Sequence, residues 1–303
     1  MPIVVNGTTL TNLIVGGTNI TKVQVRQNES SPYVIVFEQG GVVKMAYIYA
    51  GNWKMNKLKA DIDSFFTDFN TKLNQDSNKE VIIFPPACYL SYVKEKIDAS
   101  PRSSMIKLGI QNICNQNALK GSYTGQISVQ QAADCGCSYV LVGQAEVREN
   151  LGLTNAQCEV QIRATINQGM TAIYCVGENL EQHIAGEQNS VLTTQLAAIM
   201  GNLQNTEVEN NLIIVYEPIW AIGTGKTATS SDAELACSTI YNIVSEQYGS
   251  GTADKMPILY GGSLKLTNVQ EYLSQPTIDG GLFGGVSLQS TAFANTINAD
   301  VNI

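Results

Sequence analysis

Hydrophobic and polar positions alternate in two different ways along the chain, and the change comes near residue 43. Before it, the runs 10–15, 20–25 and 33–37 alternate apolar and polar residues with the period of two that is typical of half-buried strands. Asn6-Gly7 and Gly16-Gly17 separate such runs, and these dipeptides favour the turns of β-hairpins. The pattern predicts a small antiparallel β meander over residues 1–42, followed by a linker over residues 38–45.

Beyond the linker, short apolar runs alternate with longer stretches of helical period. Ile62, Phe65, Phe66, Phe69 and Leu73 recur at the i, i+3, i+4, i+7 and i+11 spacing of one helix face. Three Ser/Thr-x-x-Gln/Glu sequences predict capping boxes at helix starts. They are Ser128 with Gln131, Thr154 with Gln157, and Ser231 with Glu234.

Eight apolar runs predict strands, and each is followed by a helical stretch. Eight such units over residues 43–303 predict an α/β fold, a closed parallel (β/α)8 barrel, because a barrel of this kind typically needs about 250 residues. About 40 residues rarely form a stable core alone, so residues 1–42 are expected to dock on the barrel, on a copy of themselves or on another protein. The predicted strands are 47–50, 81–84, 107–110, 139–142, 171–176, 212–216, 257–260 and 281–283.

Composition excludes several classes of protein. A formal charge of −8 argues against a nucleic-acid surface, which needs clustered Lys and Arg. No apolar run approaches the roughly 20 residues of a membrane-spanning helix, and the first residues do not resemble a signal peptide, so a cytoplasmic protein is expected. The seven cysteines are scattered and His183 is the only histidine, so no metal site is expected. His183 itself is expected to be a solvated helix residue.

In a barrel of this kind the active site lies where the strands end at the C-terminal face. The first predicted strand is followed by G-N-W-K-M-N at residues 51–56, and the sixth leads into Y-E-P-I-W-A-I-G-T-G-K at 216–226. The seventh leads into Y-G-G-S at 260–263, and the eighth is followed by G-G-V-S at 284–287. These motifs resemble those of the triosephosphate isomerase family, in the same order, and the resemblance runs from residue 46 nearly to the C-terminus.

The resemblance implies the interconversion of glyceraldehyde 3-phosphate and dihydroxyacetone phosphate without cofactor or metal. Glu217 would take the proton next to the carbonyl, and Lys54 and Asn52 would hold the developing oxyanion. The segment 218–227 would be a closing lid that excludes water. The ligand would be a triose phosphate or a similar small anion. Its phosphate would meet backbone N–H groups near four residues, Gly223, Ser263, Gly284 and Gly285.

The end of the fourth strand departs from the family pattern V-G-H-S-E-R-R. The chain has V-G-Q-A-E-V-R, so that Gln144 stands where the family has its catalytic histidine. Ala145 and Val147 replace a serine and an arginine, and Leu153 stands where the family has a glutamate. A glutamine amide can donate a hydrogen bond to an oxyanion, but it cannot exchange a proton near pH 7. Since general acid–base catalysis is typically worth about 10²–10⁴-fold, a slow isomerase or none is expected.

Residues 111–125 match the family's dimer loop in length, which implies a homodimer, although Gln126 stands where the family has a glutamate. Three hypotheses remain open: a slow isomerase, a module that binds the anion without turnover, and a catalytically dead structural protein. In the third, residues 1–42 would anchor the chain to a larger assembly such as a phage virion or fibre, because they are similar in composition to small β modules of bacteriophage structural proteins. The chain would then be part of a virion.

Overall fold

The computed structural model describes residues 3–5, 8–10, 14–15, 18–19, 22–28, 31–38, 47–221 and 227–299. The chain divides into two compact units, Met1–Lys44 and Met45–Ile303. Residues 39–46 lie outside the described part, so the division at residues 42 and 43 stays a prediction.

The N-terminal unit consists of antiparallel strand pairs. Val5 lies opposite Thr8 and Val15 opposite Thr18, so each pair of strands flanks one of the predicted turn dipeptides. Within the described residues the pairs form three separate two-stranded sheets in place of the single meander that the sequence pattern predicts. The pairs are β1 (Ile3–Val5) with β2 (Thr8–Leu10), β3 (Ile14–Val15) with β4 (Thr18–Asn19), and β5 (Lys22–Asn28) with β6 (Ser31–Glu38).

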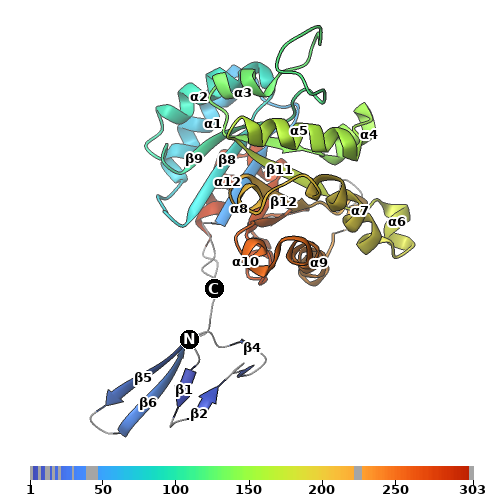
Figure 1. The fold of residues 1–303 in the computed structure, drawn as a ribbon. Helices are drawn as coiled ribbons and strands as arrows, with labels where there is room; N and C mark the ends of the chain where they lie inside the picture. The colour runs from blue at the N-terminus through green and yellow to red at the C-terminus, as the bar shows by residue number, and fades with distance from the viewer. Residues whose placement is uncertain are drawn as a thin grey trace. The chain divides into compact units, whose positions relative to one another are not determined.

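The second unit is a closed barrel of eight parallel strands, which confirms the predicted (β/α)8 fold (Figure 1). The strands follow one another around the barrel in chain order, and the last pairs with the first. They are β7 (Tyr47–Asn52), β8 (Lys79–Phe84), β9 (Ile106–Ile110), β10 (Tyr139–Val142), β11 (Thr171–Val176), β12 (Leu212–Tyr216), β13 (Ile258–Tyr260) and β14 (Gly280–Phe283).

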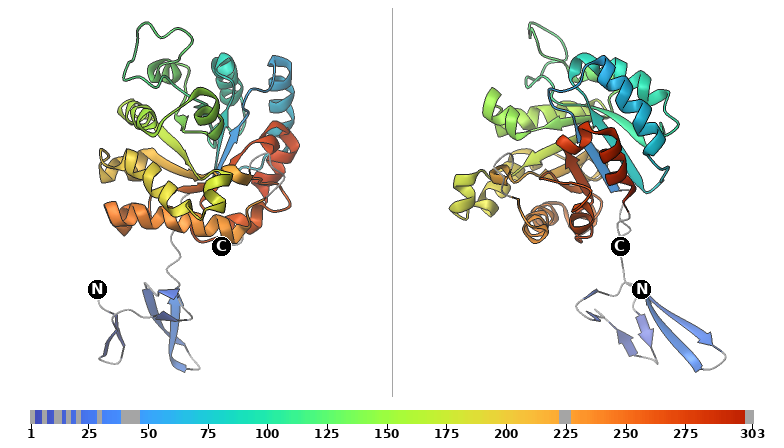
Figure 2. Two further views of the ribbon diagram at one scale, coloured as in Figure 1. Left: turned by 90° about the vertical axis from the view of Figure 1, so that its right-hand side faces the viewer. Right: turned by 180° about the vertical axis from the view of Figure 1, so that it is seen from behind.

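Helices between the strands surround the barrel (Figure 2). Within the described residues none of them is both long enough and apolar enough to span a membrane. The α-helices are α1 (Lys59–Lys72), α2 (Leu90–Asp98), α3 (Val129–Asp134), α4 (Ala145–Leu151), α5 (Asn155–Asn167), α6 (Leu180–Ile184), α7 (Gln188–Met200), α8 (Asn205–Asn211), α9 (Ser230–Tyr248), α10 (Ser250–Ala253), α11 (Val269–Leu273) and α12 (Ser290–Asn298). Three short 3-10 helices are η1 (Ala87–Tyr89), η2 (Ile219–Ala221) and η3 (Gly285–Leu288).

Two of the three predicted capping boxes are present at helix starts. The predicted capping boxes at Ser128 and Thr154 are confirmed, because both side chains accept a hydrogen bond from the backbone N–H three residues on. The apolar face predicted for the first helix is confirmed in α1. Its buried residues are Ile62, Phe65, Phe66 and Phe69.

The third predicted capping box, Ser231 with Glu234, is wrong by two residues. Helix α9 begins earlier, with Thr229 as its N-cap and Asp232 as the partner that closes the box. Thr229 has the extended backbone of an N-cap, whereas Ser231 already lies within the helix. The Glu234 carboxylate instead accepts hydrogen bonds from the Thr277 backbone N–H and hydroxyl, so tertiary contacts use the group that the local pattern assigned to the cap.

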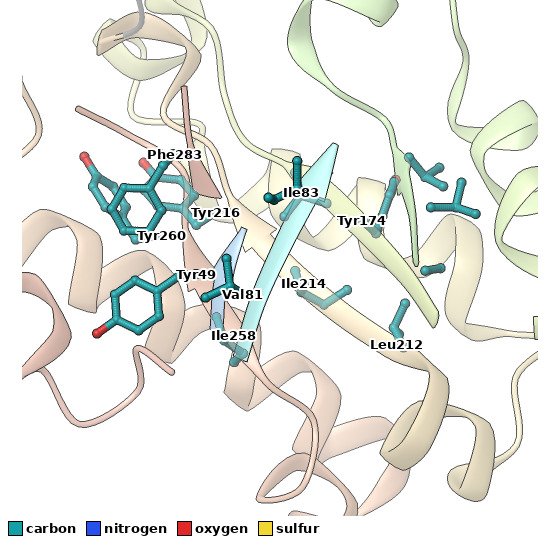
Figure 3. Packing of buried hydrophobic residues seen from close by; sticks show 14 of the residues in the cluster. Tyr49, Val81, Ile83, Tyr174, Leu212, Ile214, Tyr216, Ile258, Tyr260 and Phe283 are labelled. Carbon is teal, nitrogen blue, oxygen red and sulfur yellow. The ribbon is translucent and has the colours of Figure 1, made fainter. Parts of the chain in front are cut away.

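Successive side chains of each strand point to opposite sides, and this creates two apolar layers. The outer layer packs between strands and helices, and Tyr216 and Tyr260 lie together in it with ring centroids 6.4 Å apart (Figure 3). Phe84 points inward, and Gly109 on β9 makes room for it, since a Cβ there would lie 2.1 Å from the Phe84 ring. The buried inward residues are Ile48, Ala50, Ile82, Phe84, Leu141, Ile173, Cys175, Ile213, Val215, Leu259 and Leu282.

Candidate active site

Residues from five strand ends line one cavity of about 510 Å³ at the C-terminal face of the barrel. It brings together seven of the eight residues that the sequence assigns to the site. The eighth, Gly223, lies outside the described residues, as does the rest of 222–226 in the predicted lid. The seven are Asn52, Lys54, Gln144, Glu217, Ser263, Gly284 and Gly285.

Glu217 lies directly after β12, and the strand's alternation sets its direction. Val215 faces the barrel interior and Tyr216 the outer layer, so Glu217 faces inward, where it is only 5% exposed. Its backbone N–H donates to the Val176 carbonyl at 2.7 Å. Gly177 permits this close approach, because a Cβ there would lie 1.9 Å from the Glu217 carbonyl oxygen.

The carboxyl of Glu217 is held in a partly apolar site. Burial raises its pKa to about 7, and the nearby Glu146 carboxylate adds to the rise. The backbone N–H of Ala145, 3.2 Å from Oε2, opposes the rise in pKa, as do Lys54 and Gln144. A carboxylate whose pKa lies near neutrality is well matched to taking and returning a proton.

Gln144 connects the two sides of the cavity. Its Nε2 donates to Glu217 Oε1 at 3.1 Å and to Cys175 Sγ at 2.9 Å, and its Oε1 accepts from Asn52 Nδ2 at 2.8 Å. Gly143, with φ +76°, supplies the left-handed turn that brings Gln144 from β10 to the start of α4. The amide therefore has a fixed orientation, within a chain of hydrogen bonds from Asn52 to Glu217.

Lys54 has a strained backbone and a guided side chain. Its φ of +50° is uncommon for a residue other than glycine, and such strain is typical of functional sites. Asn52 Oδ1 accepts its backbone N–H at 2.9 Å, and Gln111 Nε2 donates to its carbonyl at 2.8 Å. Its ammonium forms an ion pair with Glu146, and the side chain stays 43% exposed. Lys54 thus presents a positive charge at the cavity.

Two glycines after the eighth strand leave part of the cavity wall open. A Cβ on Gly284 would come no closer to another residue than 3.9 Å, from Lys54 Cε, and one on Gly285 would meet nothing within 4 Å. Ser263, in the loop after β13, lines the same side. An anion can approach the backbone here, close to the ammonium of Lys54.

A second buried carboxylate, Glu178, lies after β11, and sequence reasoning missed its contacts. Its Oε1 accepts from the Tyr216 hydroxyl at 3.0 Å and from Trp220 Nε1 at 2.8 Å, and Gln188 Nε2 is 3.1 Å away. His183 Nδ1 lies 3.2 Å from the same oxygen. The contacts involve three separate segments, so only the sequence proximity of Glu178 and His183 hinted at this cluster.

His183 is an exposed residue of helix α6, as the sequence predicts, but it also makes a ring contact that the sequence did not indicate. Its ring stacks on Trp220 with centroids 4.0 Å apart, and its side chain is 39% exposed. The reason is tertiary: η2, which carries Trp220, lies against α6, which carries His183.

A second cavity, of about 430 Å³, lies beside the loop 111–125. Val147 and Leu153 both line it, together with Leu151, whose side chain is 73% exposed. The loop 111–125 contributes to its wall and carries two further exposed apolar residues, Leu119 and Tyr123.

Comparisons with known proteins agree with the geometry. The family model described as triosephosphate isomerase matches residues 47–300. The chain is 38% identical over 249 residues to the triosephosphate isomerase of Taenia solium, covering 82% of this chain and 96% of that protein. It is 39% identical over 255 residues to the triosephosphate isomerase of Lactiplantibacillus plantarum, covering 84% and 98%. The enzyme of Dictyoglomus thermophilum is 38% identical over 252 residues, covering 83% and 98%.

Proposed function

The chain belongs to the triosephosphate isomerase family, and on that premise we propose that it interconverts glyceraldehyde 3-phosphate and dihydroxyacetone phosphate, with Glu217 as the base. The observation that carries the proposal is the inward-facing Glu217 carboxyl, which has a pKa of about 7 and lies in one cavity with Lys54. The family match favours this function over that of a catalytically dead attachment protein. Residues 1–46 lie outside the match, and we propose residues 1–42 as a separate appendage.

The proposed reaction moves one proton between neighbouring carbons. Glu217 takes the proton from the carbon next to the carbonyl, and the electron pair of that C–H bond forms the double bond of an enediolate. The carbonyl oxygen becomes an oxyanion, which Lys54 and Asn52 stabilise by charge and hydrogen bonding. Protonated Glu217 then returns the proton to the other carbon.

Gln144 limits this reaction. The enediolate must also exchange a proton between its two oxygens, and the Gln144 amide can donate a hydrogen bond there without releasing a proton near pH 7. Among the described residues that line the cavity, Glu217 is the carboxyl group with a pKa near 7. Protonated Glu217 must therefore give its proton to the oxyanion and take the proton of the neighbouring hydroxyl, which it then delivers to the other carbon. We therefore propose turnover about 10²–10⁴-fold below that of an enzyme with a histidine at this position.

A coupled-enzyme assay with glyceraldehyde 3-phosphate, run on the wild type and Glu217→Ala, tests the function. Activity in the wild type that disappears in the folded variant would support the isomerase. Absence of activity in both folded proteins, or equal activity in both, would overturn it.

The proposal extends to a homodimer formed through the loop 111–125. The exposed apolar side chains of Leu119, Tyr123 and Leu151 support it, because an apolar surface of this kind is typical of a protein interface. Leu151→Glu should give a monomer in light scattering, whereas Leu235→Glu should leave the dimer intact. Leu235 is a matched control, 64% exposed on α9. A dimer that survives Leu151→Glu, or a wild-type monomer, would contradict this interface.

A further inference from the structure

Among the described residues that line the cavity, one cation is not used by the proposed mechanism. Lys265, in the loop after β13, lines it together with Lys54 and Glu217. The ammonium of Lys54 is paired with Glu146, whereas within residues 47–221 and 227–299 the ammonium of Lys265 has no hydrogen bond, ion pair or ring contact. Among the described residues that line the cavity, Lys265 is therefore the cation without a charged partner.

The loop that carries Lys265 is fixed by contacts that do not involve its side chain. Asn268 Oδ1 accepts the Lys265 backbone N–H at 2.7 Å, and Asn268 Nδ2 donates to the Ser263 carbonyl at 3.0 Å. Between them, Leu264 is 4% exposed and packs over Gly281, where a Cβ would lie 2.4 Å from Leu264 Cδ1. The position of Lys265 at the cavity is thus set by the backbone, and its side chain can be changed without removing these contacts.

The ammonium of Lys265 can compensate the negative charge of a phosphate ester bound in the cavity. A phosphate ester carries a charge of about −1.5 to −2 at pH 7, and the whole chain carries −8. Backbone N–H groups near Ser263, Gly284 and Gly285 offer hydrogen bonds without net charge, and Lys54 shares its charge with Glu146. We propose that Lys265 is a specificity-determining residue that favours doubly charged phosphate esters over singly charged or uncharged trioses. This inference deepens the proposed isomerase function and rests on it for the identity of the substrate.

The test compares Lys265→Gln with Lys255→Gln. Lys255 precedes β13 and Lys265 follows it, so the two variants lose the same charge at opposite ends of one strand. Lys255 is 60% exposed and paired with Glu209, away from the cavity. In Lys265→Gln we expect the KM for glyceraldehyde 3-phosphate to rise about three- to tenfold at low ionic strength, with kcat changed less than about twofold, because an exposed charge acts mainly on binding. Lys255→Gln should match the wild type.

Calorimetric titration with inorganic phosphate and with sulfate separates this inference from the isomerase itself. At pH 7.5 Lys265→Gln should weaken the binding of both anions about three- to tenfold. At about pH 5.5 phosphate is mainly a monoanion, so Lys265→Gln should then weaken phosphate binding less than at pH 7.5. Sulfate stays doubly charged, so the variant should weaken sulfate binding equally at both pH values. If the protein shows no turnover but its anion binding still depends on Lys265, the role of Lys265 in anion binding stands and only the proposed isomerase function is overturned. Equal anion affinity in Lys265→Gln and the wild type, or equal losses in both lysine variants, would overturn the role of Lys265.

Discussion

Glu217 and Glu178 follow neighbouring strands of the barrel, and both are buried, at 5% and 0% exposure. Glu217 lines a cavity, and each of its oxygens accepts a hydrogen bond. Glu178 gathers all its donors on Oε1, while Oε2 has no hydrogen-bond partner among the described residues. Tyr216 and Glu217 are adjacent in the chain, yet the alternation after β12 sends one to the Glu178 cluster and the other to the cavity.

The comparison shows that burial alone does not identify a catalytic carboxylate. Glu178 holds parts of the chain together, since Tyr216, Trp220 and Gln188 all donate to one oxygen. Glu217 keeps a titratable oxygen beside space that a ligand can occupy, and Lys54 lines the same cavity. The two carboxylates differ in their surroundings: hydrogen-bond donors of the protein surround Glu178, whereas Glu217 faces a cavity.

Loss of the Glu217 carboxylate should have the largest effect. In Glu217→Gln we expect kcat to fall about 10²–10⁴-fold, because the amide cannot accept the substrate proton. The assay follows initial rates at saturating glyceraldehyde 3-phosphate, with circular dichroism to confirm the fold. Comparable losses of kcat in Glu178→Gln and Glu217→Gln would remove the distinction between the two carboxylates.

The pH dependence of stability should sharpen the comparison next. The folded protein holds the Glu217 pKa near 7, above the ordinary value of 4.5, so it binds more protons than the unfolded chain between these values. The free energy of unfolding should therefore decrease as pH rises from about 4.5 to 7, by about 3 kcal/mol. Activity should rise over the upper part of the same range, since the base must be ionised.

Denaturant titrations from pH 4.5 to 8, on the wild type and Glu217→Gln, measure this slope. The variant lacks the titrating group, so the difference between the two proteins should change by about 3 kcal/mol across the range. A constant difference at every pH would mean that the Glu217 pKa is not raised.

Restoring a proton-transferring group beside Glu217 should change the rate by a smaller factor. In Gln144→His we expect kcat to increase about 10²-fold, because an imidazole can pass a proton between the two substrate oxygens. Gln144→Leu is the control, since it keeps the bulk and removes the hydrogen bonds to Asn52 and Glu217. A folded Gln144→His with an unchanged rate would show that Gln144 does not limit catalysis.

The smallest effect is expected in the Glu178 cluster. Glu178→Gln should lower the free energy of unfolding by about 1–3 kcal/mol, because its amide NH₂ would be buried without an acceptor. Calorimetric melting of the variant beside Glu217→Gln at neutral pH measures this loss, while kcat should change far less than in Glu217→Gln. A melting temperature equal to that of the wild type would show that Glu178 does not hold the cluster.

The barrel could be predicted from the chain because its information is local. Each strand appears as a short apolar run, and each helix as a stretch with period 3.6, so neither requires knowledge of distant residues. Glu217 and Lys54 could be predicted as site residues because each lies in a continuous motif after a strand, and these motifs resemble those of the triosephosphate isomerase family. The start of α9 was misplaced because several Ser and Thr residues compete there as caps, and contacts between distant residues use Glu234 elsewhere.

What the sequence determined by itself is therefore the order of the elements and the identity of the residues at the strand ends. Only the tertiary structure decided how those residues meet. The closure of eight strands brings Asn52, Gln144 and Glu217 into one chain of hydrogen bonds, and it places His183 against Trp220 and Lys265 beside the cavity. These contacts join residues far apart in the chain, and their geometry depends on the barrel's register and strand directions, which no local pattern encodes.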